Sequence, residues 1–160
     1  MLKEYKNILV AIDGSDESEQ AFKKAVQVAK RNNSVLFLTH VIDIRAFESV
    51  SSFDESLAEE ATKVAKQTLD DYVIYGNEHG VTDIHCLIEY GAPKTVIAKN
   101  LQKDHHIDLI MLGATGLNAM ERILIGSVSS YVSRNADCDV LIVRTDSNNK
   151  PLEKKDKKKK

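Results

Sequence analysis

The stretch DLIMLGATGLNAMERILIGSVSS, residues 108–130, decides which α/β fold the chain adopts. Its first six residues form an apolar run, which is typical of a strand buried on both faces of a parallel sheet. Three glycines follow, at Gly113, Gly116 and Gly126, and a serine comes directly after the last one. Glycines this close to a buried strand indicate a place where the backbone must come near another group and a Cβ atom is unwelcome.

Four other segments have the composition of strands, and helical patterns separate all five. The predicted strands cover residues 7–12, 35–42, 83–90, 108–113 and 139–144. The predicted helices begin after Ser15 or Asp16 as N-cap, near Glu55, at Pro93 and after Gly126. Strict alternation of strands and helices predicts a doubly wound, five-stranded parallel sheet with helices on both faces.

Two strand orders are common for such a sheet, and the glycine segment discriminates between them. Ligands bind beyond the carboxyl ends of the strands, where the strand order reverses. In order 3-2-1-4-5, AIDGS (residues 11–15) and LGATG (residues 112–116) meet at that point. In order 2-1-3-4-5, EYGAP (residues 89–93) would be there and the glycine segment would lie away from it. The glycine segment therefore favours 3-2-1-4-5.

The helix that starts after Gly126 has the properties of a phosphate site. Its first N–H groups are free and its dipole is positive at this end, and Ser127 and Ser129 add hydroxyl groups. For Ser127 alone, an ordinary N-cap is the alternative. The segment matches neither a Walker A loop nor a dinucleotide fingerprint, so a lysine for γ-phosphate transfer is missing.

Two residues at the ends of the first two strands have both a functional and a structural interpretation. Asp13 could bind a ribose hydroxyl or face a metal held by phosphates, or it could cap the turn into the next helix. Val41 could offer its backbone and an apolar wall to a base, or be an ordinary strand valine. The neighbouring His40 is interpreted as a packed strand residue.

These segments together resemble the universal stress protein family over roughly residues 5–144. The resemblance rests on the pattern Gly-x2-Gly-x9-Gly-Ser and on the flanking ILVAIDGS (residues 8–15), HVID (residues 40–43) and DLIMLG (residues 108–113). It implies an adenine nucleotide alpha-hydrolase-like fold and a homodimer. It also implies membership of the ATP-binding subgroup, with Mg²⁺ bound through the phosphates.

The resemblance further implies roles for individual residues. Asp13 would contact the ribose, with Gly113 nearby, while Val41 would contact the adenine and Leu112 would line the base pocket. The expected site also includes the end of the first strand, namely Ala11 and Ile12. The phosphates would be held by Gly116, Gly126, Ser127, Val128 and Ser129.

The predicted function is that of an ATP-binding regulatory module of the stress response, with no catalytic residues assigned. Family members often have His or Arg where Thr115 stands, so a cationic contact is missing there. Arg122 could replace it, although a solvated surface position is the alternative. A slow ATPase or nucleotidyl-transfer enzyme of the same fold is the second hypothesis, but HIGH- and KMSK-like signatures are absent. A flavoprotein-like domain ranks third.

Composition sets further expectations. The domain is expected over residues 1–146 and a disordered Lys-rich tail over residues 147–160. Of 22 basic and 24 acidic residues, Lys150–Lys160 holds seven lysines and two acids, which leaves 15 basic and 22 acidic residues elsewhere. An acidic body argues against a nucleic-acid partner.

Compartment and assembly are predicted from the same sequence. No apolar run approaches the roughly 18 residues of a membrane span, and no signal peptide precedes the domain, so the expected location is cytoplasmic. Cys86 and Cys138 are both expected to be buried thiols. The strand over residues 139–144, at the predicted sheet edge, is the expected dimer seam, because an apolar edge needs cover.

Overall fold

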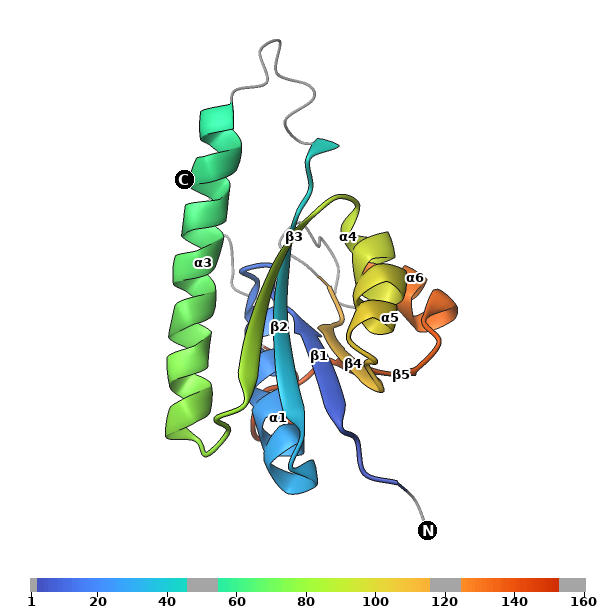
Figure 1. Cartoon of the computed structure of the whole chain (residues 1–160). Helices are drawn as coiled ribbons and strands as arrows, with labels where there is room; N and C mark the ends of the chain where they lie inside the picture. Colours follow the sequence, from blue (N-terminus) through green and yellow to red (C-terminus); the bar gives the residue numbers. More distant parts are fainter. Residues whose placement is uncertain (1–2, 46–54, 116–124, 153–160) are drawn as a thin grey trace, which may run out of the picture.

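The computed structural model describes residues 3–45, 55–115 and 125–152, and a single parallel sheet organises them (Figure 1). The strands are β1 (Asn7–Ala11), β2 (Val35–Ile42), β3 (Ile84–Tyr90), β4 (Leu109–Gly113) and β5 (Asp139–Val143). Their order is β3-β2-β1-β4-β5, and every pairing is parallel. The order 3-2-1-4-5 expected from the glycine segment is confirmed.

Helices cover both faces of this sheet and divide the core in two. One face carries α1 (Asp16–Asn32) and α3 (Glu55–Glu78). The other carries α6 (Ser127–Asn135) and a helix in three consecutive parts, α4 (Pro93–Thr95), the π-helical turn η1 (Val96–Leu101) and α5 (Gln102–Asp104). We call these the α1/α3 face and the α4/α6 face. Their cores are separate because successive residues of a strand point to opposite sides.

The helix ends follow the local sequence. Ser15 is the N-cap of α1, and its hydroxyl oxygen accepts a hydrogen bond from the Ser18 N–H at 3.1 Å. Asn33 ends the helix in the left-handed conformation at φ 52°, which asparagine tolerates better than most residues. Of the two N-caps that the sequence allowed, the structure therefore selects Ser15, and Asp16 is the first helical residue.

The two edge strands of the sheet, β3 and β5, leave side chains exposed, and one of these was expected to be buried. Cys86 was expected to be buried, and this is wrong, because β3 is an outer strand and leaves the Cys86 side chain exposed. Cys138, just before β5, is half-buried. At the opposite edge Leu141 of β5 is 44% exposed, so an apolar side chain does lie on the strand expected to form the dimer seam.

The chain after β5 returns to α1. The Lys24 ammonium donates hydrogen bonds to Thr145 Oγ1 at 2.6 Å and to Asn149 Oδ1 at 2.9 Å. The Asp146 carboxylate closes the turn by accepting from the N–H groups of Asn148 and Lys150. The domain boundary expected at residues 146–147 thus falls within a segment that contacts α1, and residues 153–160 lie outside the described residues.

Candidate functional site

The ends of β1 and β4 lie side by side, which places AIDGS next to the start of the glycine segment. Val10 is in register with Met111, one residue before the end of β1 and two before the end of β4. The Ile12 N–H donates to the Thr39 carbonyl at 2.8 Å and keeps this end beside β2 as well. In this order EYGAP follows the outer strand β3, away from the point where the strand order reverses.

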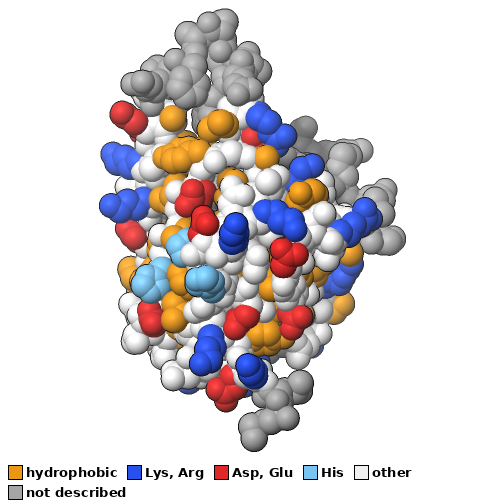
Figure 2. All heavy atoms as spheres, turned by 45° about the vertical axis from the view of Figure 1, so that its right-hand side comes forward, with side chains coloured by type: hydrophobic (Ala, Val, Ile, Leu, Met, Phe, Trp, Pro, Cys, Tyr) orange, Lys and Arg blue, Asp and Glu red, His pale blue; other side chains and the backbone are white. Residues whose placement is uncertain are grey.

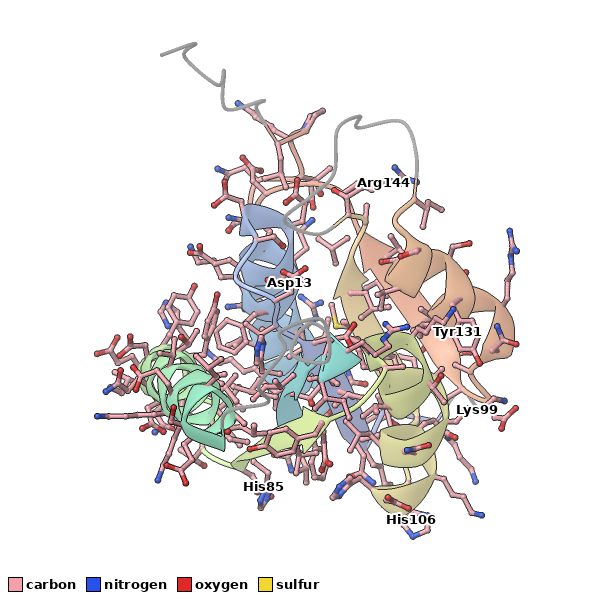
Figure 3. The ribbon with its side chains drawn as sticks, turned by 90° about the horizontal axis from the view of Figure 1, so that it is seen from above. Asp13, His85, Lys99, His106, Tyr131 and Arg144 are labelled. Atoms are coloured by element: carbon pink, nitrogen blue, oxygen red, sulfur yellow. The ribbon has the colours of Figure 1, made fainter. Side chains whose placement is uncertain are left out.

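Asp13 organises the turn that leads from β1 into α1. Its Oδ1 accepts hydrogen bonds from the Ser15 N–H at 2.9 Å and the Ser15 hydroxyl at 2.5 Å. Gly14 occupies the positive-φ position of the turn, at φ 82°. The turn-capping interpretation of Asp13 thus describes this geometry, while the side chain stays exposed at the carboxyl end of the sheet (Figure 3).

Gly113 excludes a Cβ for a reason within the fold. A Cβ added there would lie 2.7 Å from Glu17 Cβ and 2.8 Å from the Glu17 carbonyl carbon, in the first turn of α1. Real Cβ contacts are not that short, so α1 can pack against the end of β4 only where that residue is glycine. The group that would meet a side chain at position 113 is therefore Glu17, through both its Cβ and its backbone.

The first turn of α6 lies directly beyond β4. Gly126 is its N-cap, and no side chain of the described residues caps it. The Gly126 N–H donates to the Ala114 carbonyl at 2.8 Å, and the Ser129 hydroxyl donates to the Gly113 carbonyl at 2.7 Å. These two bonds fix the helix start against the strand end. The Ser129 hydroxyl proton is therefore already used in a hydrogen bond. The donors of this turn that remain for a ligand are backbone N–H groups and the exposed Ser127 hydroxyl.

Apolar side chains of the α4/α6 face form the floor beneath this turn. Leu112 is buried, and Ala11, Val41 and Val128 pack partly buried against the same core. Four of the expected site residues are thereby brought onto one face. Ile12 is not among them, since its side chain belongs to the core of the α1/α3 face.

Two expected residues cannot be placed. Gly116 and Arg122 lie outside the described residues. Of the described part of the expected phosphate site, residues 113–115 and 126–129, no residue is Lys, Arg or His. Arg144, directly after β5, is exposed at the same end of the sheet (Figure 3).

Acidic residues set the electrostatics at the start of α1. Asp16, Glu17 and Glu19 occupy its first turn, where a positive helix end favours them. The pKa of Tyr72 on α3 is raised to about 12, mainly by burial and further by Glu19 and Asp13. A bound polyphosphate is therefore more compatible with the α6 start than with the α1 start.

Histidines gather at the other end of the sheet. The rings of His85 and His105 flank Phe37 at centroid distances of 5.3 Å and 5.1 Å, and Figure 2 shows histidine side chains together on this face. The helix that starts at Pro93 ends at its C-cap His105, and the exposed His106 follows in the left-handed conformation at φ 51°. Among the residues that the structure describes, no group of three His, Cys, Asp or Glu side chains could hold a metal ion.

His40 makes contacts that the sequence interpretation did not predict. Its Nδ1 lies 2.7 Å from the Ile12 carbonyl oxygen. Its ring lines a cavity of about 500 Å³ between the ends of β1 and β2 and the helix α3. Strand alternation is the signal that could have found it, because His40 must face the side opposite to Val41.

The architecture and these residues agree with one family. The profile of the universal stress protein family matches residues 4–144, which is most of the chain. The chain belongs to the universal stress protein family. The family profile thus covers all five strands and the turn at the start of α6.

Relatives and solved structures of the family agree over the same region. A Staphylococcus haemolyticus (strain JCSC1435) protein, whose name also places it among the universal stress proteins, is 45% identical over 142 residues, 89% of this chain and 86% of its own length. Universal stress protein UspA from Lactobacillus plantarum is 34% identical, with a TM-score of 0.78 over 89% of this chain and all of that one. A universal stress protein solved in complex with cAMP is 29% identical, with a TM-score of 0.70 over 88% and 98% of the two chains. The adenine nucleotide alpha-hydrolase-like fold of this family is therefore the fold of the chain.

One further property concerns membranes. Within the described ranges, no helix is both long and apolar enough to cross a bilayer.

Proposed function

We propose that this universal stress protein binds ATP, with Mg²⁺ held through the phosphates, and acts as a nucleotide-dependent regulatory module of the stress response. The observation that carries the proposal is the start of α6. Its first backbone N–H groups, which no described side chain caps, adjoin the strand ends at which the sheet order reverses. A homologous structure contains cAMP, which supports an adenine nucleotide as the ligand class.

The residues around this turn suit the parts of such a ligand. The apolar floor of Ala11, Val41 and Leu112 would support the base. The Asp13 carboxylate has acceptor capacity beyond its bonds to Ser15 and would meet the ribose. Backbone N–H groups of residues 127–129 and the Ser127 hydroxyl would hold the phosphates, with Gly116 and Gly126 in the same loop.

Binding and release, rather than turnover, are the proposed activity. Phosphoryl transfer needs a positioned base and cationic groups that stabilise the transition state. In the described part of the phosphate site, the side chains are hydroxyl or apolar groups. Occupancy of the site would therefore be the signal that a partner protein reads.

We further propose a homodimer through residues 139–144. β5 is an outer strand with exposed Leu141, and an exposed apolar edge favours association with a second copy. Sedimentation velocity at micromolar concentration tests this directly. Dimers are expected for the unaltered chain, and Leu141→Lys should shift them to monomers. A monomer throughout would contradict this part of the proposal.

Isothermal titration calorimetry with ATP, with and without Mg²⁺, tests the main proposal. Mass spectrometry of small molecules released on denaturation complements it. Saturable ATP binding supports the proposal. If denaturation releases no nucleotide and calorimetry detects no ATP binding, the proposal is overturned. Recovered FMN or FAD would indicate a flavoprotein-like domain instead.

The variant Gly126→Val tests whether ATP binds at the start of α6. The N-cap has φ −61° and ψ 161°, a conformation that valine adopts readily, so the fold should persist while the side chain crowds the phosphates. The expected loss in ATP affinity is roughly 10-fold or more, the scale of one charge-assisted hydrogen bond. Mg²⁺-dependent turnover well above background that disappears in Ser127→Ala would instead establish the ATPase alternative.

A further inference from the structure

A second cavity lies at the same end of the sheet, on the opposite face from the proposed nucleotide site. It has a volume of about 500 Å³ and is lined by the β1–α1 turn, His40 of β2 and one side of α3. This volume is within the range of small-molecule sites in proteins. Figure 1 shows α3 running beside β2 and β3, and residues of α3 from Leu57 to Leu69 line the cavity.

Helix α3 lines the cavity with apolar side chains, and the small residues among them leave space for a ligand. The residues facing the cavity recur at helical spacing, with small Ala61 and Ala65 between larger neighbours. Leu69 is buried at the floor, whereas Leu57 and Val64 are 44% and 52% exposed. Two large apolar side chains that remain so accessible on one cavity indicate a surface suited to an apolar ligand.

The polar side chains of the cavity offer mainly hydrogen-bond acceptors, because the Thr68 hydroxyl donates its proton to the Val64 carbonyl at 3.0 Å within α3. The Ile12 carbonyl can only accept, so His40 Nδ1 carries the proton of their 2.7 Å bond. In a neutral His40 ring, Nε2 is then left as an acceptor. The carboxylates of Asp13 and Glu60 also line the cavity, and none of the eleven described lining residues is Lys or Arg.

Strand alternation separates this cavity from the nucleotide site. Ile12 and His40 point toward α3, whereas Ala11 and Val41 point toward α6. Only the turn at Asp13 and Gly14 adjoins both. A ligand in this cavity would therefore leave the first turn of α6 free.

We propose that this cavity binds a small apolar molecule bearing an amino group. Its apolar part would pack against Ala61, Val64 and Leu69, and its N–H groups would be bound by His40 Nε2 and the carboxylate of Glu60 or Asp13. The assignment of this ligand class rests on the negative charge of the lining residues and on the volume of the cavity. It does not depend on nucleotide binding.

Amide chemical shifts of the ¹⁵N-labelled full chain, titrated with tryptamine, test the proposal. Indole-3-acetate is the matched control, since it has the same ring with the opposite charge. Tryptamine should shift the amides of Ala61, Val64 and Thr68 saturably, with a Kd on the order of 1 mM for so small a ligand, while Ser127–Ser129 stay unchanged. Indole-3-acetate should bind at least about 10-fold more weakly, since its charge opposes both carboxylates.

Three variants test where tryptamine binds. Ala61→Phe should fill the cavity and abolish the tryptamine shifts, while Lys66→Phe, an exposed position on the same helix that does not line the cavity, should retain them. Glu60→Gln, also exposed, should weaken tryptamine about 3-fold or more without disturbing the core. Shifts confined to other elements, no saturation on α3, or equal binding of the two indoles would each overturn the proposal.

Discussion

The two faces of the sheet offer the same strand ends to two different proposed sites. On the α4/α6 face the donors are backbone N–H groups at the start of α6, above an apolar floor. On the α1/α3 face the polar groups are side chains, His40, Asp13 and Glu60, around a cavity. Successive residues, such as His40 and Val41, contribute to different faces because side chains alternate along a strand. One short segment of sequence can therefore serve two sites that share only a turn.

Substitution of Gly113 and of Gly126 should produce the largest difference in this comparison. Gly113→Val should destabilise the protein by about 1–3 kcal/mol, because its Cβ would overlap the first turn of α1. Gly126→Val should change stability by less than about 0.5 kcal/mol, although it faces the proposed phosphate site. Urea denaturation of both variants measures the difference. Equal stabilities would show that Gly113 is not required for packing.

Adjacent residues of β2 test whether the faces are independent. Val41→Ala should weaken ATP by about 5-fold, because it removes part of the apolar floor, near 1 kcal/mol for the lost methyl groups. His40→Ala should change ATP affinity less than about 2-fold and reduce tryptamine binding instead. Calorimetry with each ligand gives the four affinities. A large loss of ATP binding in His40→Ala would place both residues in one site.

Tyr72 offers a pH test of the α1/α3 face. Its pKa is raised to about 12 in the folded protein, mainly by burial, whereas an unfolded tyrosine titrates near pH 10. The folded state thus disfavours the tyrosinate, so this stability is complete below about pH 10 and falls as pH rises toward 12. Urea midpoints should decline less steeply over that range in Tyr72→Phe. An identical decline would assign the effect to other groups.

The two cysteines should give the smallest difference between the faces, because the expected difference is in thiol reactivity and not in stability. Cys138, on the α4/α6 face, is half-buried and its pKa is raised to about 11 by burial and by Asp108. Cys86, at the β3 edge, is exposed, although partial burial and Asp70 raise its pKa as well. Alkylation near pH 8 should modify Cys86 first, because Cys138 is both less accessible and rarely ionised. Cys86→Ser should then leave one slowly reacting thiol.

The sequence predicted the topology because hydrophobic runs and glycines report on strand burial and order. Each strand was located within a residue or two, and the helix from Ser15 to Asn33 was delimited by its caps. The glycine segment gave the right order, although the structure explains Gly113 by its contact with Glu17. Contacts between segments distant in sequence leave no local pattern, so this cause was not predictable.

The candidate site was predicted less completely. Ala11, Val41, Leu112 and Val128 share a face, whereas the Ile12 side chain belongs to the opposite core, and the binding role of all five stays a prediction. The cavity at His40 depends on where α3 lies against β2, which amphipathicity alone does not determine. Cys86 was misassigned for a similar reason, because an apolar run does not distinguish an inner from an outer strand.

The central position of β1 has a consequence for synthesis of the chain. β1 pairs on one side with β2, fewer than 30 residues away, and on the other with β4, where Ile8 meets Leu109. At roughly 5–20 residues per second, a ribosome needs on the order of 5–20 s to make the intervening chain. During that interval the apolar edge of β1 has no partner strand. We expect arrested nascent chains ending before β4 to be sensitive to proteolysis and to bind chaperones, and chains that include β5 to resist.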